Sequence, residues 1–272
     1  MGWVRRELSE LGIPPLKRFG QHFLLSQEAR DGLVYAAELS REDTVVEVGA
    51  GLGFVTTALA SRAGKVIAIE KDRTLAKHLQ SKFATSQNVQ VIEGDALAFA
   101  IPAKAKIVSS PPYNISSKLV VEIINSRFSL ASLLLQEDFV RRLTAANGTR
   151  DYGRLTVMLQ TRSQAQYVSK VSKFAFYPVP KVDSAIATVR PRPTFEIPNP
   201  EDTEIFEDLV RALFTQRRRR LRGVFSKYLE TNYRTHKQEI LAKVQLGEKR
   251  VYELAPPEFV ALSNMIADSI KD

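Results

Sequence analysis

A short stretch with two adjacent prolines carries the residues best suited to chemistry. In Ser110-Pro111-Pro112-Tyr113, a serine hydroxyl and a proline carbonyl can accept the two N–H groups of an exocyclic amine. The prolines fix φ near −65° and stiffen the loop, and a tyrosine offers a flat face to a nucleobase. We therefore take Ser110, Pro111 and Tyr113 as candidate catalytic residues; an ordinary Pro-Pro turn after a strand is an equally open interpretation.

Glycines and two carboxylates predict a nucleoside site upstream of this loop. Gly49, Gly51 and Gly53 follow an apolar run at a spacing that differs from the dinucleotide fingerprint, and no P-loop is present. Glu70 lies about 20 residues further on, where a carboxylate can accept from ribose hydroxyls. Asp95 follows a third apolar run and can accept from an adenine amine. Each feature alone has a structural explanation as a tight turn or a solvated loop residue. Their positions after the first, second and third predicted strands together favour a nucleoside ligand.

Alternating strands and helices must position these residues. Apolar runs of strand length alternate with helical spacing at 55–61, 75–82 and 118–124, a pattern typical of βαβ units and a mostly parallel sheet. A proline-bearing loop in place of a helix predicts that the last two strands form an antiparallel hairpin. The predicted strands are 44–48, 65–70, 89–93, 107–110, 132–136, 164–171 and 185–189.

The C-terminal part of the chain has a different pattern. Four prolines in Arg190-Pro-Arg-Pro and Ile197-Pro-Asn-Pro indicate a linker. Beyond it, two apolar stripes with helical spacing (206–214 and 221–229) precede Pro256-Pro257, which suits the start of a last helix. We predict an α/β domain over 1–190 and a small helical domain over 191–272.

Composition limits the partners and the compartment. Lys plus Arg number 39 against 30 acidic residues, a formal charge of +9, so polyanions are attracted to the chain. Neither a membrane span nor a signal peptide is evident, which predicts a cytoplasmic protein. Without cysteine, and with three widely spaced histidines, we expect no metal site. The sequence leaves the oligomeric state open, and a monomer is the working expectation.

Six ordered motifs resemble the ribosomal RNA adenine dimethyltransferase family, and the likeness spans nearly the whole chain. The motifs are Phe19-Gly-Gln-His-Phe-Leu24, Glu47-Val-Gly-Ala-Gly51, Gly94-Asp-Ala96, Ser110-Pro-Pro-Tyr-Asn-Ile-Ser116, Asp151-Tyr-Gly-Arg-Leu155 and Phe176-Tyr-Pro-Val-Pro-Lys-Val-Asp-Ser184. The resemblance implies a Rossmann-like methyltransferase domain with a seven-stranded sheet and an N-terminal segment that caps the cofactor, followed by the all-α domain.

The resemblance also implies a reaction, its cofactor and the residues that bind it. S-adenosylmethionine would donate methyl groups to the N6 amines of two adjacent adenosines near the 3′ end of small-subunit ribosomal RNA, free or in a pre-ribosomal subunit. The candidate cofactor-binding residues are Gln21, His22, Leu24, Gly49, Gly51, Glu70, Asp95, Ala96 and Ser110.

Two further groups are candidates for RNA contact. The resemblance places the loop with Phe176 and Tyr177 against the target base, although these rings could instead plug the sheet edge. Five arginines at the junction of the two apolar stripes, interpreted as a short helical run, are candidates for phosphate contacts, with a solubility role as the alternative. They are Arg217, Arg218, Arg219, Arg220 and Arg222. Lys17 and Arg18 would extend the basic rim.

One departure from the family keeps rival functions open. The family usually has Asn-Leu-Pro-Tyr where this chain has Ser110-Pro-Pro-Tyr113. Serine has a shorter reach, so the second methylation is less secure than the first, and an RNA-binding assembly factor with vestigial catalysis is the main alternative. An adenine methyltransferase acting on DNA is a weaker one, because the motifs extend along most of the chain. Histidine at position 22, where bacterial relatives carry asparagine, can still offer one donor or acceptor.

Overall fold

The computed structural model describes residues 2–13, 20–193, 196–244 and 247–271, and Lys17 and Arg18 lie outside them. The chain forms two compact units, one of 1–140 with 165–191 and one of 141–164 with 192–272. Residues 141–164, which the sequence analysis assigned to the first domain, thus belong with the C-terminal helices. Their helix α7 (Arg154–Arg162) packs against helices from beyond residue 200, a long-range pairing that no local pattern reports. The roles predicted for the two domains stay predictions.

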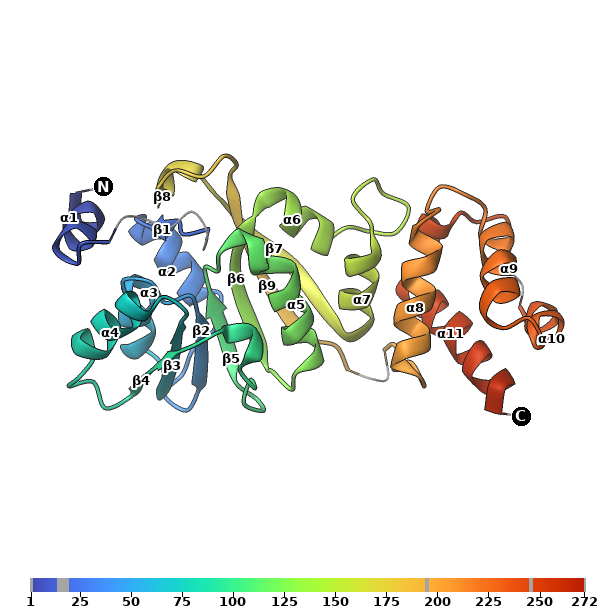
Figure 1. The fold of residues 1–272 in the computed structure, drawn as a ribbon, viewed down its shortest axis with the longest axis horizontal. Coiled ribbons are helices and arrows are strands. Elements are labelled where there is room, and N and C mark those ends of the chain that lie inside the picture. Colours follow the sequence, from blue (N-terminus) through green and yellow to red (C-terminus); the bar gives the residue numbers. More distant parts are fainter. Residues whose placement is uncertain (1, 14–19, 194–195, 245–246, 272) are drawn as a thin grey trace. The chain divides into compact units, whose positions relative to one another are not determined.

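The first unit is built on a seven-stranded, mostly parallel sheet, as predicted (Figure 1). Its order is β4-β3-β2-β5-β6-β9-β7, in which the first five strands are parallel to one another and β9 is antiparallel to β6. β7 and β9 are neighbours at one edge, as the predicted hairpin requires. The bounds are β2 Thr44–Val48, β3 Lys65–Glu70, β4 Val89–Glu93, β5 Lys106–Ser109, β6 Leu130–Gln136, β7 Ser163–Val171 and β9 Ser184–Pro191.

Burial explains why the central strands read as continuous apolar runs. In β2, Val45, Val46 and Val48 are all buried, as are the five residues after Lys65 in β3, because helices cover both faces of a parallel sheet. Asp72 caps the helix after β3 by accepting from the amides of Thr74 and Leu75. The helices around the sheet are α2 Gln27–Tyr35, α3 Phe54–Ala60, α4 Arg73–Lys82, α5 Ser116–Asn125 and α6 Glu137–Leu143.

Smaller elements of the first unit complete the surroundings of the site. A nine-residue helix, α1 (Gly2–Glu10), begins the chain. A two-stranded antiparallel sheet joins β1 (Phe23–Leu24) to β8 (Phe176–Tyr177), and thereby brings an N-terminal motif to the loop before β9. Among the described residues of this unit, the short 3₁₀ turns are η2 Ala96–Ala98, η3 Tyr113–Ile115 and η4 Lys173–Ala175.

The second unit is helical, as predicted. The apolar stripes of α8 (Thr203–Phe214) and α9 (Leu221–Asn232) are buried in one core with α11 (Pro256–Lys271), which begins at the expected proline. The shorter α10 (Lys237–Lys243) adds Ile240 to this core. No helix within the described ranges is long and apolar enough to cross a membrane.

Candidate active site and RNA-facing surface

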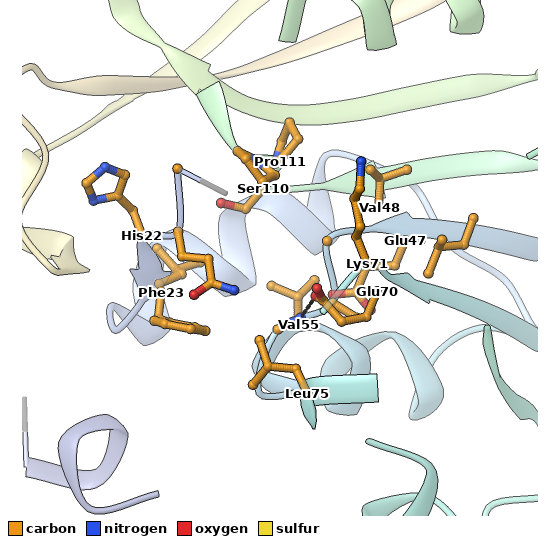
Figure 2. Close-up of a pocket in the computed structure, with 18 of the residues that line it drawn as sticks. His22, Phe23, Glu47, Val48, Val55, Glu70, Lys71, Leu75, Ser110 and Pro111 are labelled. Carbon is orange, nitrogen blue, oxygen red and sulfur yellow. Dashed lines mark hydrogen bonds between the residues drawn. The ribbon is translucent and has the colours of Figure 1, made fainter. Parts of the chain in front are cut away.

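One cavity of the first unit, of about 270 Å³, lies where β2, β3 and β5 end (Figure 2). This edge of an open α/β sheet is where such folds bind ligands. Every residue that the sequence analysis assigned to the cofactor or to catalysis lines the cavity. They are Gln21, His22, Leu24, Gly49, Gly51, Glu70, Asp95, Ala96, Ser110, Pro111 and Tyr113.

The glycine loop after β2 allows close approach to the pocket floor. Gly49 and Gly51 have φ of +74° and +57°, a region that side chains disfavour. A Cβ on Gly49 would lie 3.3 Å from Cδ of Pro112, and one on Gly51 would lie 3.4 Å from the Phe23 ring. Glycine at both positions therefore keeps the loop close to the catalytic loop and to β1 without filling the space for a ligand.

Glu70 ends β3 with its carboxylate inside the pocket wall. One oxygen accepts from the amide of Gly51 at 2.8 Å and the other from the amide of Asp72 at 2.9 Å. The side chain is only 7% exposed, and burial raises its pKa although the two amide donors oppose the shift. Glu70 therefore fixes the glycine loop to the start of α4, and it lines the pocket where the sequence analysis expects an acceptor for ribose.

Glu47 is a second buried carboxyl, which the sequence analysis quoted only as part of a motif. It is 2% exposed, and Oε2 accepts from the Thr56 hydroxyl at 2.6 Å. Burial, with a smaller contribution from the charge of Glu70, raises the pKa of Glu47 to about 8. At neutral pH this side chain is therefore mostly protonated. Its high burial inside an otherwise apolar strand could have been anticipated from the sequence, since β2 reads Thr-Val-Val-Glu-Val.

Asp95 lies at the exposed rim of the pocket. Its carboxylate accepts from Nζ of Lys71 at 2.8 Å and from the amide of Leu97 at 3.0 Å, which caps η2. The hydrogen bond from Lys71 is the main reason that the pKa of Asp95 is lowered. An ionised acceptor thus stands beside a cation at the mouth of the pocket, and Lys71 is a lining residue that the sequence analysis missed.

The loop after β5 is fixed at both ends. At its start, the hydroxyl of Ser109 donates to the carbonyl of Val48 at 2.7 Å. At its end, the Tyr113 hydroxyl lies 2.7 Å from that of Ser184 on β9, and burial raises the pKa of Tyr113. Between these anchors Pro111 is buried, and the Ser110 hydroxyl points into the pocket (Figure 2).

His22 connects the catalytic loop to the segment before β9. Its ring stacks on Tyr113 with centroids 5.6 Å apart and an interplanar angle of 27°. The Nδ1 atom lies 2.7 Å from the carbonyl oxygen of Pro178, so Nδ1 carries the proton and donates. This hydrogen bond sets the tautomer and leaves Nε2 as the nitrogen able to meet a ligand.

Residues 16–267 match the family model described as "Ribosomal RNA adenine dimethylase". The chain belongs to this family. Among its relatives, the probable ribosomal RNA small subunit methyltransferase A of Thermococcus onnurineus is 40% identical, with 92% of each chain covered. The protein of the same description from Methanosarcina acetivorans is 41% identical, over 92% of this chain and 93% of the relative. The chain is accordingly a ribosomal RNA adenine methyltransferase, as the resemblance implied.

Solved structures of RNA methyltransferases have the same fold as this chain. A dimethyladenosine transferase from Plasmodium falciparum superposes with a TM-score of 0.82 at 28% identity, covering 91% of this chain and 98% of that one. The 23S rRNA methyltransferase ErmE gives 0.65 at 30% identity, covering 90% and 99%. The Rossmann-like methyltransferase fold that the sequence analysis expected is confirmed.

The aromatic loop of the dimethylase is packed inward. Phe176 is 1% exposed, lies opposite Leu24 in the β1–β8 sheet and is one of the residues that line the cavity, so its ring points into the first unit and not to solvent. Tyr177 is half-buried, with the Arg5 guanidinium 4.9 Å from its ring centroid. The exposed aromatic ring of this segment is Phe174, at 66%, which the sequence analysis missed. Stacking of Phe176 or Tyr177 on the target base stays a prediction.

Four of the five arginines, Arg217 to Arg220, lie in the connection between α8 and α9, which corrects the predicted helical run, whereas Arg222 lies in the first turn of α9. Residues 215–220 connect α8 to α9, and the backbone of this connection is held by distant partners: Arg220 forms an isolated bridge with Arg250, and the Leu221 amide donates to the Lys249 carbonyl. These tertiary hydrogen bonds replace helical ones, which local spacing could not show.

The five arginines differ in what they contact. Arg217 donates to the carbonyls of Thr149 and Arg150 at 3.1 and 3.0 Å, and its guanidinium lies 5.6 Å from the Tyr252 ring centroid. Arg220 pairs with Glu248. The other three, Arg218, Arg219 and Arg222, are exposed, so they are better placed for phosphate contacts than Arg217 and Arg220.

Proposed function

We propose that this dimethylase transfers methyl groups from S-adenosylmethionine to the N6 amines of two adjacent adenosines near the 3′ end of small-subunit ribosomal RNA. One observation carries the proposal: the acceptor carboxylate of Glu70 and the stiff Ser110-Pro111 loop line the same cavity. A nucleoside bound by Glu70 and an amine held by the loop would therefore share one space. We expect this activity in the cytoplasm, on free RNA or an assembling subunit.

The residues present fit this cofactor. Gly49 and Gly51 line the pocket with backbone, and a Cβ on either would press against Pro112 or the Phe23 ring. Glu70 and Asp95 provide acceptors for ribose hydroxyls and the adenine amine. His22 can offer Nε2, because Pro178 holds Nδ1. The bound sulfonium supplies a methyl group activated by the positive charge on sulfur.

The catalytic loop then has to hold a weak nucleophile in position. The lone pair of the adenine amine is delocalised into the ring, so acceptors that hold both N–H groups favour a pyramidal nitrogen whose lone pair is available. The Ser110 hydroxyl and the Pro111 carbonyl are suited to this, and the buried proline keeps them aimed. Orientation of this kind supplies a large part of a rate enhancement. No strong general base is needed, since the methylated ammonium loses its proton readily to water.

Nucleoside mass spectrometry of treated, unmethylated small subunits tests the proposal. We expect dimethyladenosine from the natural chain and none from a Ser110→Ala/Tyr113→Ala double variant. Monomethyladenosine alone would limit the proposal to one transfer, and Ser110→Asn should then restore the second. If the natural chain binds the RNA but incorporates no methyl group, the assembly-factor alternative, which Ser110 in place of asparagine keeps open, replaces the enzyme. Duplex DNA as a competing substrate should accept no methyl group.

A further inference from the structure

Helix α1 lies outside the family match yet forms part of the pocket. The family model begins at residue 16, whereas α1 covers Gly2–Glu10 and its Trp3 lines the cavity. The family's shared sequence therefore does not account for this part of the wall. The helix lies at the same end of the first unit as α4 (Figure 1).

The inner face of α1 packs on residues that themselves line the cavity. Val4 and Leu8 are buried in a cluster with Phe23, Leu52 and Leu75, and these last three all line the pocket. The Trp3 ring lies 5.2 Å from that of Phe54, at 43°, another lining residue. The helix is thus a second layer over one wall of the pocket, and Trp3 reaches past that layer to the cavity.

A polar contact fastens the helix at its other end. Oε1 of Glu7 lies 2.9 Å from Nε2 of His78 and 3.2 Å from Nζ of Lys82, both on α4. Lys82 also donates to the carbonyl of Leu52 at 2.7 Å, so the same ammonium joins α1 to the glycine-rich turn. Isolated helices of this length are marginal in water, and α1 therefore depends on these contacts to stay in place.

We propose that α1 is a closing helix for the cofactor site, in which Trp3 covers the bound nucleoside and Glu7 latches the helix to α4. The proposal rests on the proposed use of S-adenosylmethionine. A closed α1 excludes water from one side of the ligand and slows its dissociation. Opening requires loss of the Glu7 contacts and of the apolar packing of Val4 and Leu8. These contacts therefore limit the rate at which the ligand dissociates.

The chain contains one tryptophan, so its fluorescence reports on this position alone. Calorimetry first establishes that the natural chain binds S-adenosylmethionine or S-adenosylhomocysteine. Titration with either ligand should then change the Trp3 emission at the same midpoint. If calorimetry shows no binding, the proposed function fails and the closing helix with it. If binding occurs with unchanged Trp3 emission, the closing helix is wrong and the proposed function stands.

Dissociation rates of the ligand in variants complete the test. Trp3→Ala should release S-adenosylhomocysteine about 3- to 10-fold faster, the equivalent of one aromatic contact, and Trp3→Phe should recover most of this loss. Glu7→Gln should accelerate release by a smaller factor that shrinks as salt rises. Arg6→Ala, an exposed position on the same helix, is the matched control and should leave release unchanged. Equal rates in Trp3→Ala and the natural chain, with both folded by thermal melting, would overturn the proposal.

Discussion

The hydroxyl oxygens of Tyr113 and Ser184 lie 2.7 Å apart. Tyr113 begins the turn after the catalytic loop, and Ser184 is the first residue of β9, which runs antiparallel to β6. The hydrogen bond therefore fixes the loop to the part of the sheet that departs from the parallel pattern. Because Tyr113 also stacks on His22, one side chain links three segments that are far apart in sequence.

The Tyr113–Ser184 pair should show energetic coupling. Tyr113→Phe keeps the ring but leaves the buried Ser184 hydroxyl without this partner, and Ser184→Ala removes the partner of the tyrosine. Each change should lower the free energy of unfolding by about 1 kcal/mol, and the double variant by less than the sum of the two. Urea unfolding measures all three. Strict additivity would show that the hydrogen bond contributes nothing.

The cofactor affinity should depend on Glu70. In Glu70→Gln one carboxylate oxygen becomes an amide nitrogen, so either Gly51 or Asp72 loses its acceptor and the acceptor available to a ribose weakens. We expect the Kd for S-adenosylhomocysteine to rise by about 10-fold or more, as for the loss of a charged hydrogen bond, together with a lower melting temperature. Asp95→Asn, at the exposed rim, should weaken binding without a change in melting temperature.

Stability should carry a pH dependence that comes from Glu47. Its pKa rises from the usual 4.5 to about 8 in the folded state, so between these values the folded chain holds a proton that the unfolded chain has released. The contribution of this group to stability is thus complete below about pH 4.5, falls as pH rises, and is lost above about 8. Melting temperatures measured across this range should therefore fall relative to those of Glu47→Gln.

Glu47→Gln is the informative comparison because its amide oxygen can still accept from Thr56 without becoming charged. The difference in melting temperature between this variant and the natural chain should widen from pH 4.5 to 8 and then stay constant. A difference that is the same at every pH would mean that Glu47 does not titrate in this range. Thr56→Val separates the loss of the hydrogen bond from the titration, because it removes the donor and keeps the carboxyl.

The arginines at the junction of α8 and α9 should divide into two functional classes. Arg219→Ala and Arg222→Ala should weaken RNA binding with little change in stability, and each should reduce the slope of log K against log salt by about 0.7 to 0.9 if its guanidinium contacts a phosphate. Arg217→Ala should instead lower the free energy of unfolding by about 1 kcal/mol, since its hydrogen bonds are to carbonyls of the same unit. Filter binding at several salt concentrations and thermal melting measure the two effects. Unchanged salt slopes would remove Arg219 and Arg222 from the interface.

Local pattern alone predicted most of the first unit. The strands over 44–48 and 65–70 agree with β2 and β3, because a buried parallel strand must be apolar along its length and the turns that end it must contain glycine or a polar cap. The strand over 89–93 agrees with β4, which is a partly exposed edge strand. The residues that line the pocket could be predicted for the same reason: parallel strands end at a common edge, so side chains that follow them converge. The family motifs then specified the reaction.

Tertiary structure decided what local pattern cannot encode. The β1–β8 pairing, the attachment of Tyr113 to Ser184 and the association of residues 141–164 with the C-terminal helices all join segments whose sequences are unremarkable alone. The turn between α8 and α9 is likewise held by the bridge from Arg220 to Arg250, and Phe176 is buried by segments far away in the chain. The sequence by itself determined the family, the sheet and the chemistry at its edge, since these follow from residue type and short spacing. Only the folded chain decided which arginines face solvent, which aromatic ring is exposed and that Trp3 reaches the pocket, because burial depends on long-range contacts.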